Sequence, residues 1–176
     1  MGRNDPDVSQ LIGGYPVCPA CGSREVARDA WTLWDIEARE WCLRSVFDAY
    51  TCEGCGADIT PDWKLDEAMR TARIRTINDA LRQGCFDNAS IMVTSGVQQR
   101  GNDFVENAAN LVAGYKDFDP DNDPHGEHDF GGFEIDGEKL FWKVDYYDRS
   151  LSAHSPDAAN PLVTHRVLTI MLASEY

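Results

Sequence analysis

The chain has 176 residues, 30 of them acidic and 16 basic, which gives a formal net charge of −14. This length fits one ordinary domain, or a small metal-held module followed by a compact domain, and the 43% hydrophobic content is sufficient for a packed core. The composition therefore excludes wholesale disorder. It also disfavours general nucleic-acid or membrane binding, because an acidic surface repels phosphates and anionic lipid.

The first fourteen residues are polar and glycine-rich, so we expect a flexible lead-in over 1–14. They contain no apolar run typical of a signal peptide, and no later stretch has the length of a transmembrane helix. Cysteines kept as thiols fit a reducing compartment, so we expect a cytoplasmic protein.

Two Cys-x-x-Cys pairs follow, Cys18 with Cys21 and Cys52 with Cys55. Each pair can form a tight turn that binds one side of a tetrahedral ion, and two pairs complete a four-thiolate shell with Zn–S distances of about 2.3 Å. Such a shell leaves no position for water, so the sequence predicts one structural Zn²⁺ per chain. A redox Cys-x-x-Cys or two disulfides are the alternatives, but a redox site needs only one pair.

Between the cysteine pairs, residues 24–34 and 40–50 are rich in β-branched and aromatic side chains and are separated by a turn at 35–38. A hairpin between two cysteine knuckles is typical of a zinc ribbon, which we assign to residues 15–64. The core of so small a module is thin, so we expect metal binding and folding to be one event.

From residue 65 the hydrophobic period changes, and residues 65–176 predict a small α+β domain with an antiparallel sheet and about three helices. The helices are predicted over 66–82, 102–115 and 161–174, the second with Asn102 or Asp103 as its cap. The strands are predicted at 90–94, 133–135 and 139–147. Asp136-Gly137 is typical of the turn in a hairpin formed by the last two strands.

The segment from Asp117 to Glu138 carries nine carboxylates and two histidines but no lysine or arginine. Imidazoles beside carboxylates are the ligand types of a mixed nitrogen–oxygen metal site with open positions, which could activate a water. The candidates for such catalysis are His125, His128, Asp129 and Glu127. Their spacing matches no established metal motif, and the same residue types also cap turns and tie loops, so a structural role and a partner-binding surface are alternatives.

Residues 141–147 alternate between an apolar set, which predicts core, and a set that mixes charges and aromatics beside the acidic segment. We take as candidates for partner binding Asp121, Asp123, Lys143, Asp145 and Tyr147. A solvated sheet face with cross-strand pairs is the alternative for the last three. The chain has no phosphate-binding loop, dinucleotide fingerprint, nucleophile elbow or His-Glu-x-x-His sequence, so nothing supports nucleophilic catalysis.

Three motifs, NDPHGEHDFG at 122–131, FWKVDYYD at 141–148 and RVLTIMLASEY at 166–176, together resemble an uncharacterised family of domains of unknown function. That family is associated with Alphaproteobacteria and is often plasmid-borne. The resemblance covers roughly residues 72–176, and the N-terminal part is similar to small zinc-ribbon proteins of the same bacteria. It implies a ribbon fused to such a domain, and an accessory or anti-defence role.

We therefore expect a non-enzymatic adaptor or inhibitor that binds a protein with a basic surface, with acidic groups standing in for nucleic-acid charge as in anti-CRISPR or anti-restriction proteins. A metal-dependent hydrolase built on His125, His128 and their neighbouring carboxylates is the alternative. A ribbon that reads nucleic acid through its arginines ranks last, because the module carries more acid than base.

Overall fold

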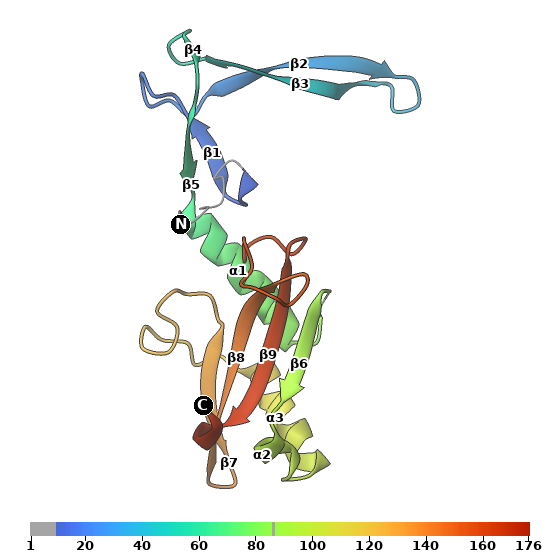
Figure 1. Ribbon diagram of the computed structural model, residues 1–176, viewed down its shortest axis with the longest axis vertical. Coiled ribbons are helices and arrows are strands. Elements are labelled where there is room, and N and C mark those ends of the chain that lie inside the picture. The colour runs from blue at the N-terminus through green and yellow to red at the C-terminus, as the bar shows by residue number, and fades with distance from the viewer. Residues whose placement is uncertain (1–9, 86) are drawn as a thin grey trace. The chain divides into compact units, whose positions relative to one another are not determined.

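The computed structural model describes residues 10–85 and 87–176, and the chain divides into two compact units, Met1–Asp66 and Glu67–Tyr176 (Figure 1). The expected lead-in falls largely on residues 1–9, which lie outside the described residues, and Gly14 already begins the first strand. Among the described residues, no helix is both long enough and apolar enough to cross a membrane.

The first unit consists of five strands in two small sheets. Their bounds are β1 (Gly14–Val17), β2 (Val26–Asp35), β3 (Glu40–Cys52), β4 (Asp58–Ile59) and β5 (Asp62–Leu65). β1 pairs with β5, and the predicted hairpin of β2 and β3 is confirmed as a long antiparallel pair, with β4 joined to the base of β3. The side chain of Asp35 closes the hairpin turn by accepting hydrogen bonds from the backbone N–H groups of Glu37 and Ala38.

The interior of the first unit is almost entirely its cysteine cluster. Among its described residues, Cys18 and Cys52 are the only members of the buried hydrophobic set, and Pro61 is the only other buried residue. A unit that buries so few apolar residues lacks the hydrophobic stabilisation of an ordinary domain, and small units of this kind usually need a metal or cross-links. The stability of the first unit therefore depends on what joins its cysteines.

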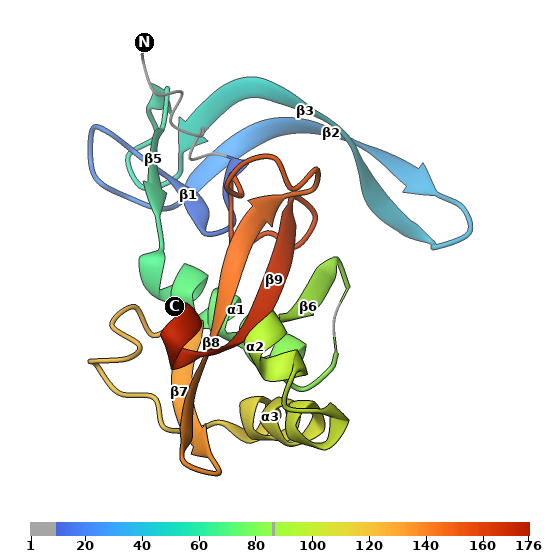
Figure 2. The same ribbon diagram turned by 60° about the horizontal axis from the view of Figure 1, so that its bottom comes forward.

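The second unit packs three helices against a four-stranded sheet (Figure 2). The helices are α1 (Glu67–Arg82), α2 (Ser95–Gln98) and α3 (Asn102–Gly114). The strands are β6 (Ala89–Val93), β7 (Phe130–Ile135), β8 (Glu138–Asp148) and β9 (Thr164–Leu172), followed by the short 3₁₀ turn η2 (Ala173–Glu175). They lie in the order β6-β9-β8-β7, with β6 parallel to β9 and the other pairs antiparallel.

The prediction of a C-terminal helix over 161–174 is wrong, because this segment forms β9 in the middle of the sheet. Seven of the nine β9 residues are buried, so both faces of the strand are covered. A strand buried on both faces lacks the alternation of apolar and polar residues that identifies a half-buried strand, and its continuous apolar run also fits a helix.

The cap of α3 also differs from the prediction. Gly101, rather than Asn102 or Asp103, is the N-cap, and its φ of 96° lies in a region that favours glycine. The third helix of the unit is the short α2, which follows β6 directly. The expected class, α+β with a ribbon-like hairpin at the N-terminal end, is nevertheless what the structure has.

The core of the second unit lies between the helices and one face of the sheet. Trp142 and Leu140 on β8, with Leu168 and Ile170 on β9, point into the same cluster as buried residues from all three helices. The Trp142 side chain is fully buried, as the alternation along 141–147 predicted. This packing fixes β8, and β8 positions the residues discussed below.

Gly131 allows Trp142 to pack against β7. A Cβ at Gly131 would lie 2.6 Å from Trp142 Nε1 and 2.8 Å from Tyr115 Cε1. We expect Gly131→Ala to lower the free energy of unfolding of the second unit by about 1–3 kcal/mol, because two packed rings must shift. Urea denaturation followed by tryptophan fluorescence measures this change.

The matched control is Gly114→Ala at the end of α3, where a Cβ meets no atom within 4 Å. Alanine is the better helix former, so this variant should be as stable as the wild type or more stable, by up to about 1 kcal/mol. Equal stability of Gly131→Ala and the wild type would contradict the packing described for Trp142.

Candidate functional site

The four cysteines of the two Cys-x-x-Cys pairs converge, and every pair of their sulfur atoms lies within 4.8 Å. The Sγ atoms of Cys18 and Cys55 are 3.9 Å apart, and those of Cys21 and Cys52 are 3.6 Å apart. A tetrahedral metal with bonds of about 2.3 Å to sulfur requires sulfur–sulfur separations of about 3.8 Å. The cluster therefore fits a four-coordinate metal ion, and all four cysteines are free of disulfides.

Two similar turns build this metal centre. In the first, the N–H of Gly22 donates to the carbonyl of Cys18 at 2.9 Å, and in the second the N–H of Gly56 donates to that of Cys52 at 2.7 Å. Both glycines have a positive φ, near 73° and 72°. The first cysteine of each pair is buried and the second is exposed, so the metal would be reachable from one side only and would have no open position for a substrate.

The thiols influence one another strongly. Hydrogen bonding from the Cys21 backbone N–H, the largest contribution, lowers the pKa of Cys18 to about 7. At Cys21 the Ser23 backbone N–H favours the thiolate, but hydrogen bonds with the neighbouring Cys52 and Cys18 thiols outweigh it and raise the pKa to about 12. Sulfur atoms this close cannot all ionise without a cation among them, and a bound divalent metal would supply that charge.

His128, a candidate from the acidic segment, is held between α1 and a loop residue. Its Nδ1 lies 2.9 Å from Oδ1 of Asp79 on α1, and its ring stacks on Phe118 with centroids 3.7 Å apart and planes 2° apart. Its φ of 54° lies in the left-handed region, which is uncommon for a residue with a side chain. These contacts hold the imidazole in one orientation against α1.

The other candidate residues of the acidic segment mainly form hydrogen bonds that stabilise the loop. Asp123 is buried, and its Oδ1 accepts hydrogen bonds from the backbone N–H groups of Glu127 and His128 at 2.9 and 3.1 Å. The hydroxyl of Tyr146 donates to Oε2 of Glu127 at 3.1 Å. Asp123 is therefore not available to a partner, whereas Asp121 is exposed.

His125 and His128 do not converge on a metal-binding cluster in the described part of the chain, where the four-cysteine group is the only set of three or more potential ligands found. His125 is exposed and, with Arg75, lines a shallow hollow beside the loop. The mixed nitrogen–oxygen metal site expected from composition therefore stays a prediction, and the loop residues are joined by hydrogen bonds.

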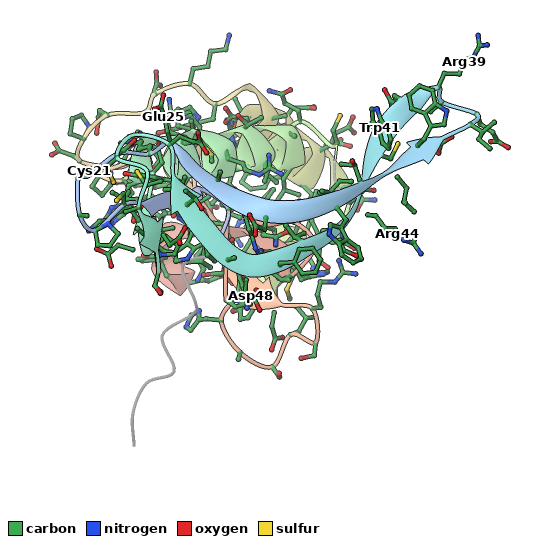
Figure 3. The ribbon with its side chains drawn as sticks, turned by 90° about the horizontal axis from the view of Figure 1, so that it is seen from above. Cys21, Glu25, Arg39, Trp41, Arg44 and Asp48 are labelled. Atoms are coloured by element: carbon green, nitrogen blue, oxygen red, sulfur yellow. The ribbon has the colours of Figure 1, made fainter. Side chains whose placement is uncertain are left out.

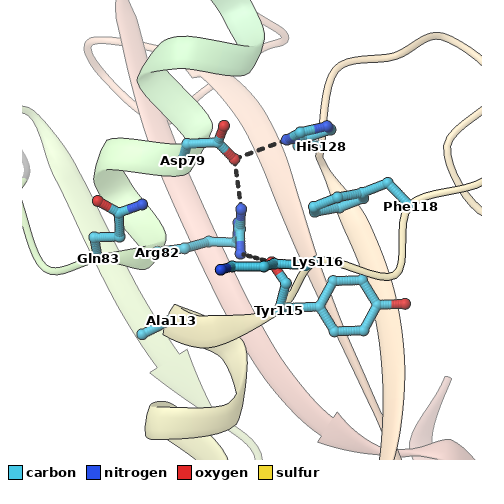
Figure 4. A pocket seen from close by; sticks show the side chains of 8 residues that line it. All are labelled: Asp79, Arg82, Gln83, Ala113, Tyr115, Lys116, Phe118 and His128. Atoms are coloured by element: carbon cyan, nitrogen blue, oxygen red, sulfur yellow. Dashed lines mark hydrogen bonds and ion pairs between the residues drawn. The ribbon is translucent and has the colours of Figure 1, made fainter.

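A pocket of about 390 Å³ adjoins His128 (Figure 4). Its lining residues are Asp79, Arg82, Gln83, Ala113, Tyr115, Lys116, Phe118 and His128. The guanidinium of the buried Arg82 donates to Asp79 and to the carbonyls of Val112 and Tyr115, which joins α1 to the end of α3. A carboxylate that orients an imidazole beside cations is an arrangement suited to general-base catalysis.

Two buried donors near this pocket, Arg82 Nε and Trp142 Nε1, lack a hydrogen-bond partner among the described residues. Aromatic rings surround both: the Arg82 guanidinium lies 5.1 Å from the ring centroids of Phe118 and Trp142, and Trp142 meets Tyr115 edge-on. Contacts of this kind with π faces partly compensate buried N–H groups. Sequence reasoning missed Asp79 and Arg82, although their i, i+3 spacing on a predicted helix was a usable signal.

The candidates on β8 form a solvated sheet face. Lys143 Nζ lies 2.9 Å from Oδ2 of Asp145, and this pairing raises the pKa of Lys143. The ring of Tyr147 stacks on His154 with centroids 6.3 Å apart. All three side chains are half-exposed, so a partner could reach them, but their contacts are the ordinary pairs of a sheet surface.

Metal content tests both the cysteine cluster and the acidic loop. We expect elemental analysis to find one metal ion per chain in the wild type and in His125→Ala/His128→Ala, because the four thiolates are the only candidate ligand cluster among the described residues and neither histidine belongs to it. Removal by a chelator should unfold the first unit, since folding and binding are coupled. Cys21→Ser should have the same effect, and hydrogen exchange confined to residues 10–66 would detect it.

Burial raises the pKa values of Glu127 and Asp129. A carboxyl whose pKa is higher in the folded state stabilises the fold at low pH, and this contribution is lost as the pH rises through the folded pKa. We therefore expect Glu127→Gln to gain stability relative to the wild type as the pH rises above 4.5, the ordinary value for glutamate. Urea denaturation from acidic to neutral pH measures the difference.

Asp148 gives a control of opposite sign. Hydrogen bonding, first from the Ser152 backbone N–H, lowers its pKa from 3.8 to about 2, so its contribution is present above pH 3.8 and is lost as the pH falls towards 2. Asp148→Asn should be less stable than the wild type at neutral pH and equal to it in acid. The same sign for both variants would contradict these assignments.

In the comparison with known proteins, no curated protein and no solved structure matches the chain. Residues 93–175 match a family model described as a protein of unknown function (DUF3768). The matched span begins at the end of β6 and includes the acidic loop, β8 and β9, whereas the cysteine cluster and α1 lie outside it. The greater part of the second unit therefore matches an uncharacterised family of domains, DUF3768.

Proposed function

We propose that this protein is a non-enzymatic adaptor or inhibitor that acts by binding a protein with a basic surface. The observation that carries the proposal is that the carboxylates of the acidic segment fall into two groups. Some of its carboxylates, such as Asp123, are used inside the fold, and others stay exposed without a cation. The exposed set without an ion pair to any described residue consists of Asp117, Asp119, Asp121, Glu134 and Asp136.

The distribution of charge supports the same proposal. Acidic residues outnumber basic ones in both units, so neither unit has the net positive charge that favours phosphate binding. Uncompensated carboxylates attract a basic surface over about one Debye length, roughly 8 Å at physiological salt. A protein that binds nucleic acid presents such a surface.

The metal centre supports a structural rather than a chemical role for the first unit. Zn²⁺ is the metal we assign to it, since four thiolates in a closed tetrahedron suit zinc and leave no open coordination position. Thiols maintained for a metal fit a reducing cytoplasm. The resemblance to often plasmid-borne alphaproteobacterial domains supports an accessory role on a mobile element, including inhibition of a nucleic-acid-cutting defence enzyme at its basic groove.

The test is salt-dependent capture followed by charge variants. The immobilised protein should retain a basic protein at low salt and release it at several-fold higher salt, because salt screens exposed charges. With the purified partner, Asp117→Asn/Asp121→Asn should weaken binding by about 2–10-fold, as expected for losing two exposed charge pairs. Isothermal titration calorimetry measures both dissociation constants.

The matched control is Asp103→Asn/Glu106→Gln, which removes the same charge from exposed positions on α3. It should change the dissociation constant by less than about twofold if binding uses the acidic segment. Retention of no basic protein at low salt would contradict the proposal. An equal effect of both double variants would show that net charge, and not this segment, is recognised.

An enzyme is the second candidate, favoured by the orientation of His128 by Asp79 beside Arg82 and Lys116 in a pocket. The metal-dependent hydrolase expected from composition additionally requires a metal held by His125 and His128. A second metal ion that disappears in His125→Ala/His128→Ala would favour this candidate over the adaptor.

A further inference from the structure

The β2–β3 hairpin leaves an unusual amount of apolar surface exposed. Figure 3 shows the ribbon running from the end near Cys21 and Glu25 to a tip near Arg39, with Trp41 beside the tip. Its exposed large apolar residues are Trp31, Leu33, Trp34, Ile36, Trp41, Leu43, Val46 and Phe47. Trp31 and Trp41 are each 68% exposed, although single exposed apolar residues, not groups of eight, are normal on a monomer.

The register of the hairpin divides these side chains between two faces. Trp34 pairs with Trp41 and Thr32 pairs with Leu43, so these four share one face, which we call the tryptophan face. The rings of Trp34 and Trp41 meet edge-on with centroids 5.6 Å apart. Leu33 with Cys42, and Asp35 with Glu40, occupy the opposite face. Alternation along β2 adds Trp31 to that face, next to a register shift between Trp31 and Thr32, and its ring meets Phe47 edge-on with centroids 5.1 Å apart.

The edges of the hairpin are open as well. β2 pairs only with β3, and β4 covers β3 only at Tyr50 and Thr51. Long apolar edge strands without cover are sites at which another chain pairs or packs. The described residues of the first unit contribute no side chain that buries the tryptophan face, since its members remain exposed.

The two faces differ in charge. The tryptophan face carries no charged residue among its paired positions, whereas the opposite face places Asp35 directly across from Glu40, and alternation along β3 adds Arg44 to it. A symmetric dimer brings like surfaces together. Two copies of the opposite face would bring four carboxylates and two arginines into one interface, where every charge must be desolvated and the negative charges are in excess. Two copies of the tryptophan face meet without that cost.

The exposed area is sufficient for such a contact. Aromatic side chains bury about 150–250 Å² each, so two tryptophan faces with their neighbours would bury roughly 1,000 Å² in total, the lower limit for a specific interface. Tryptophan is also among the residues that contribute most to binding energy at the centre of an interface.

We infer that two copies of this chain associate through the tryptophan faces of their β2–β3 hairpins. The occupant of the surface is thus a second copy, packed about a two-fold axis with Trp34 and Trp41 at its centre. This association is independent of the proposed binding of a basic partner, and it responds to salt in the opposite direction. Salt screens the repulsion between two chains of charge −14 and so strengthens the dimer, whereas it weakens binding through carboxylates.

The experiment is light scattering coupled to size-exclusion chromatography on the metal-loaded full chain, at concentrations up to about 0.2 mM. We expect a concentration-dependent dimer that becomes tighter as salt is raised. Trp34→Thr/Trp41→Thr should raise the dissociation constant at least about tenfold, because it removes the two central anchors. Threonine suits a strand, so the hairpin itself should persist.

The matched control is Trp31→Thr/Leu33→Thr, which removes two large apolar side chains from the opposite face of the same hairpin. It should leave the dissociation constant within about twofold of the wild type. Metal content and circular dichroism must be equal in both variants, which separates loss of association from loss of fold. A wild type that stays monomeric at high salt, or a control that weakens the dimer as much as the tryptophan-face variant, would overturn the inference.

Discussion

The convergence of four cysteine sulfurs is the constraint on which the first unit depends. It joins Cys18 to Cys55 and Cys21 to Cys52 across more than thirty residues, and these cysteines take the place of an apolar core. Because the buried hydrophobic set of the described first unit contains only Cys18 and Cys52, the free energy that orders its strands would come largely from the metal–thiolate bonds that these cysteines can form. A hairpin fixed at its base in this way can carry apolar side chains outward without burying them.

The second unit has an ordinary apolar core, and side-chain hydrogen bonds from α1 attach the acidic loop and the end of α3 to it. Asn78 and Asp79 on α1 bind the backbone of Glu127 and the ring of His128, and Arg82 binds the end of α3. Buried polar groups are stabilising only when each finds a partner, and here nearly all do. The acidic segment has the composition of a metal site, but the role that its contacts support first is attachment of a long loop to α1.

The two proposed contacts lie on different units and depend on different interactions, electrostatic attraction in one and burial of apolar surface in the other. Exposed carboxylates of the second unit favour a basic partner and act through long-range, salt-sensitive attraction. The tryptophan face of the hairpin is uncharged and favours a second copy through burial of tryptophan, which salt does not weaken. A dimer would present two acidic surfaces at once, so the overall strength of binding to a partner with repeated basic sites would exceed that of one chain.

The local sequence was sufficient for the features that depend on neighbouring residues. Cysteine spacing predicted the metal cluster, β-rich runs and a turn predicted the hairpin, helical periodicity predicted α1, and Asp136-Gly137 predicted the β7–β8 turn. These signals are short-range, because caps, turns and period depend on residues close in the chain.

The remaining features depend on contacts between residues that are distant in the chain. The β9 sequence also fits a helix because both faces of this central strand are buried, and that burial depends on the packing around the sheet and not on the pattern of β9 itself. The Asp79–His128 pair spans 49 residues, so no local spacing reveals it. The β2–β3 hairpin has the alternation of apolar and polar residues that predicts a half-buried strand. Whether its apolar face is buried depends on whether another element packs against it. The tryptophan face is exposed because nothing in its own unit covers it.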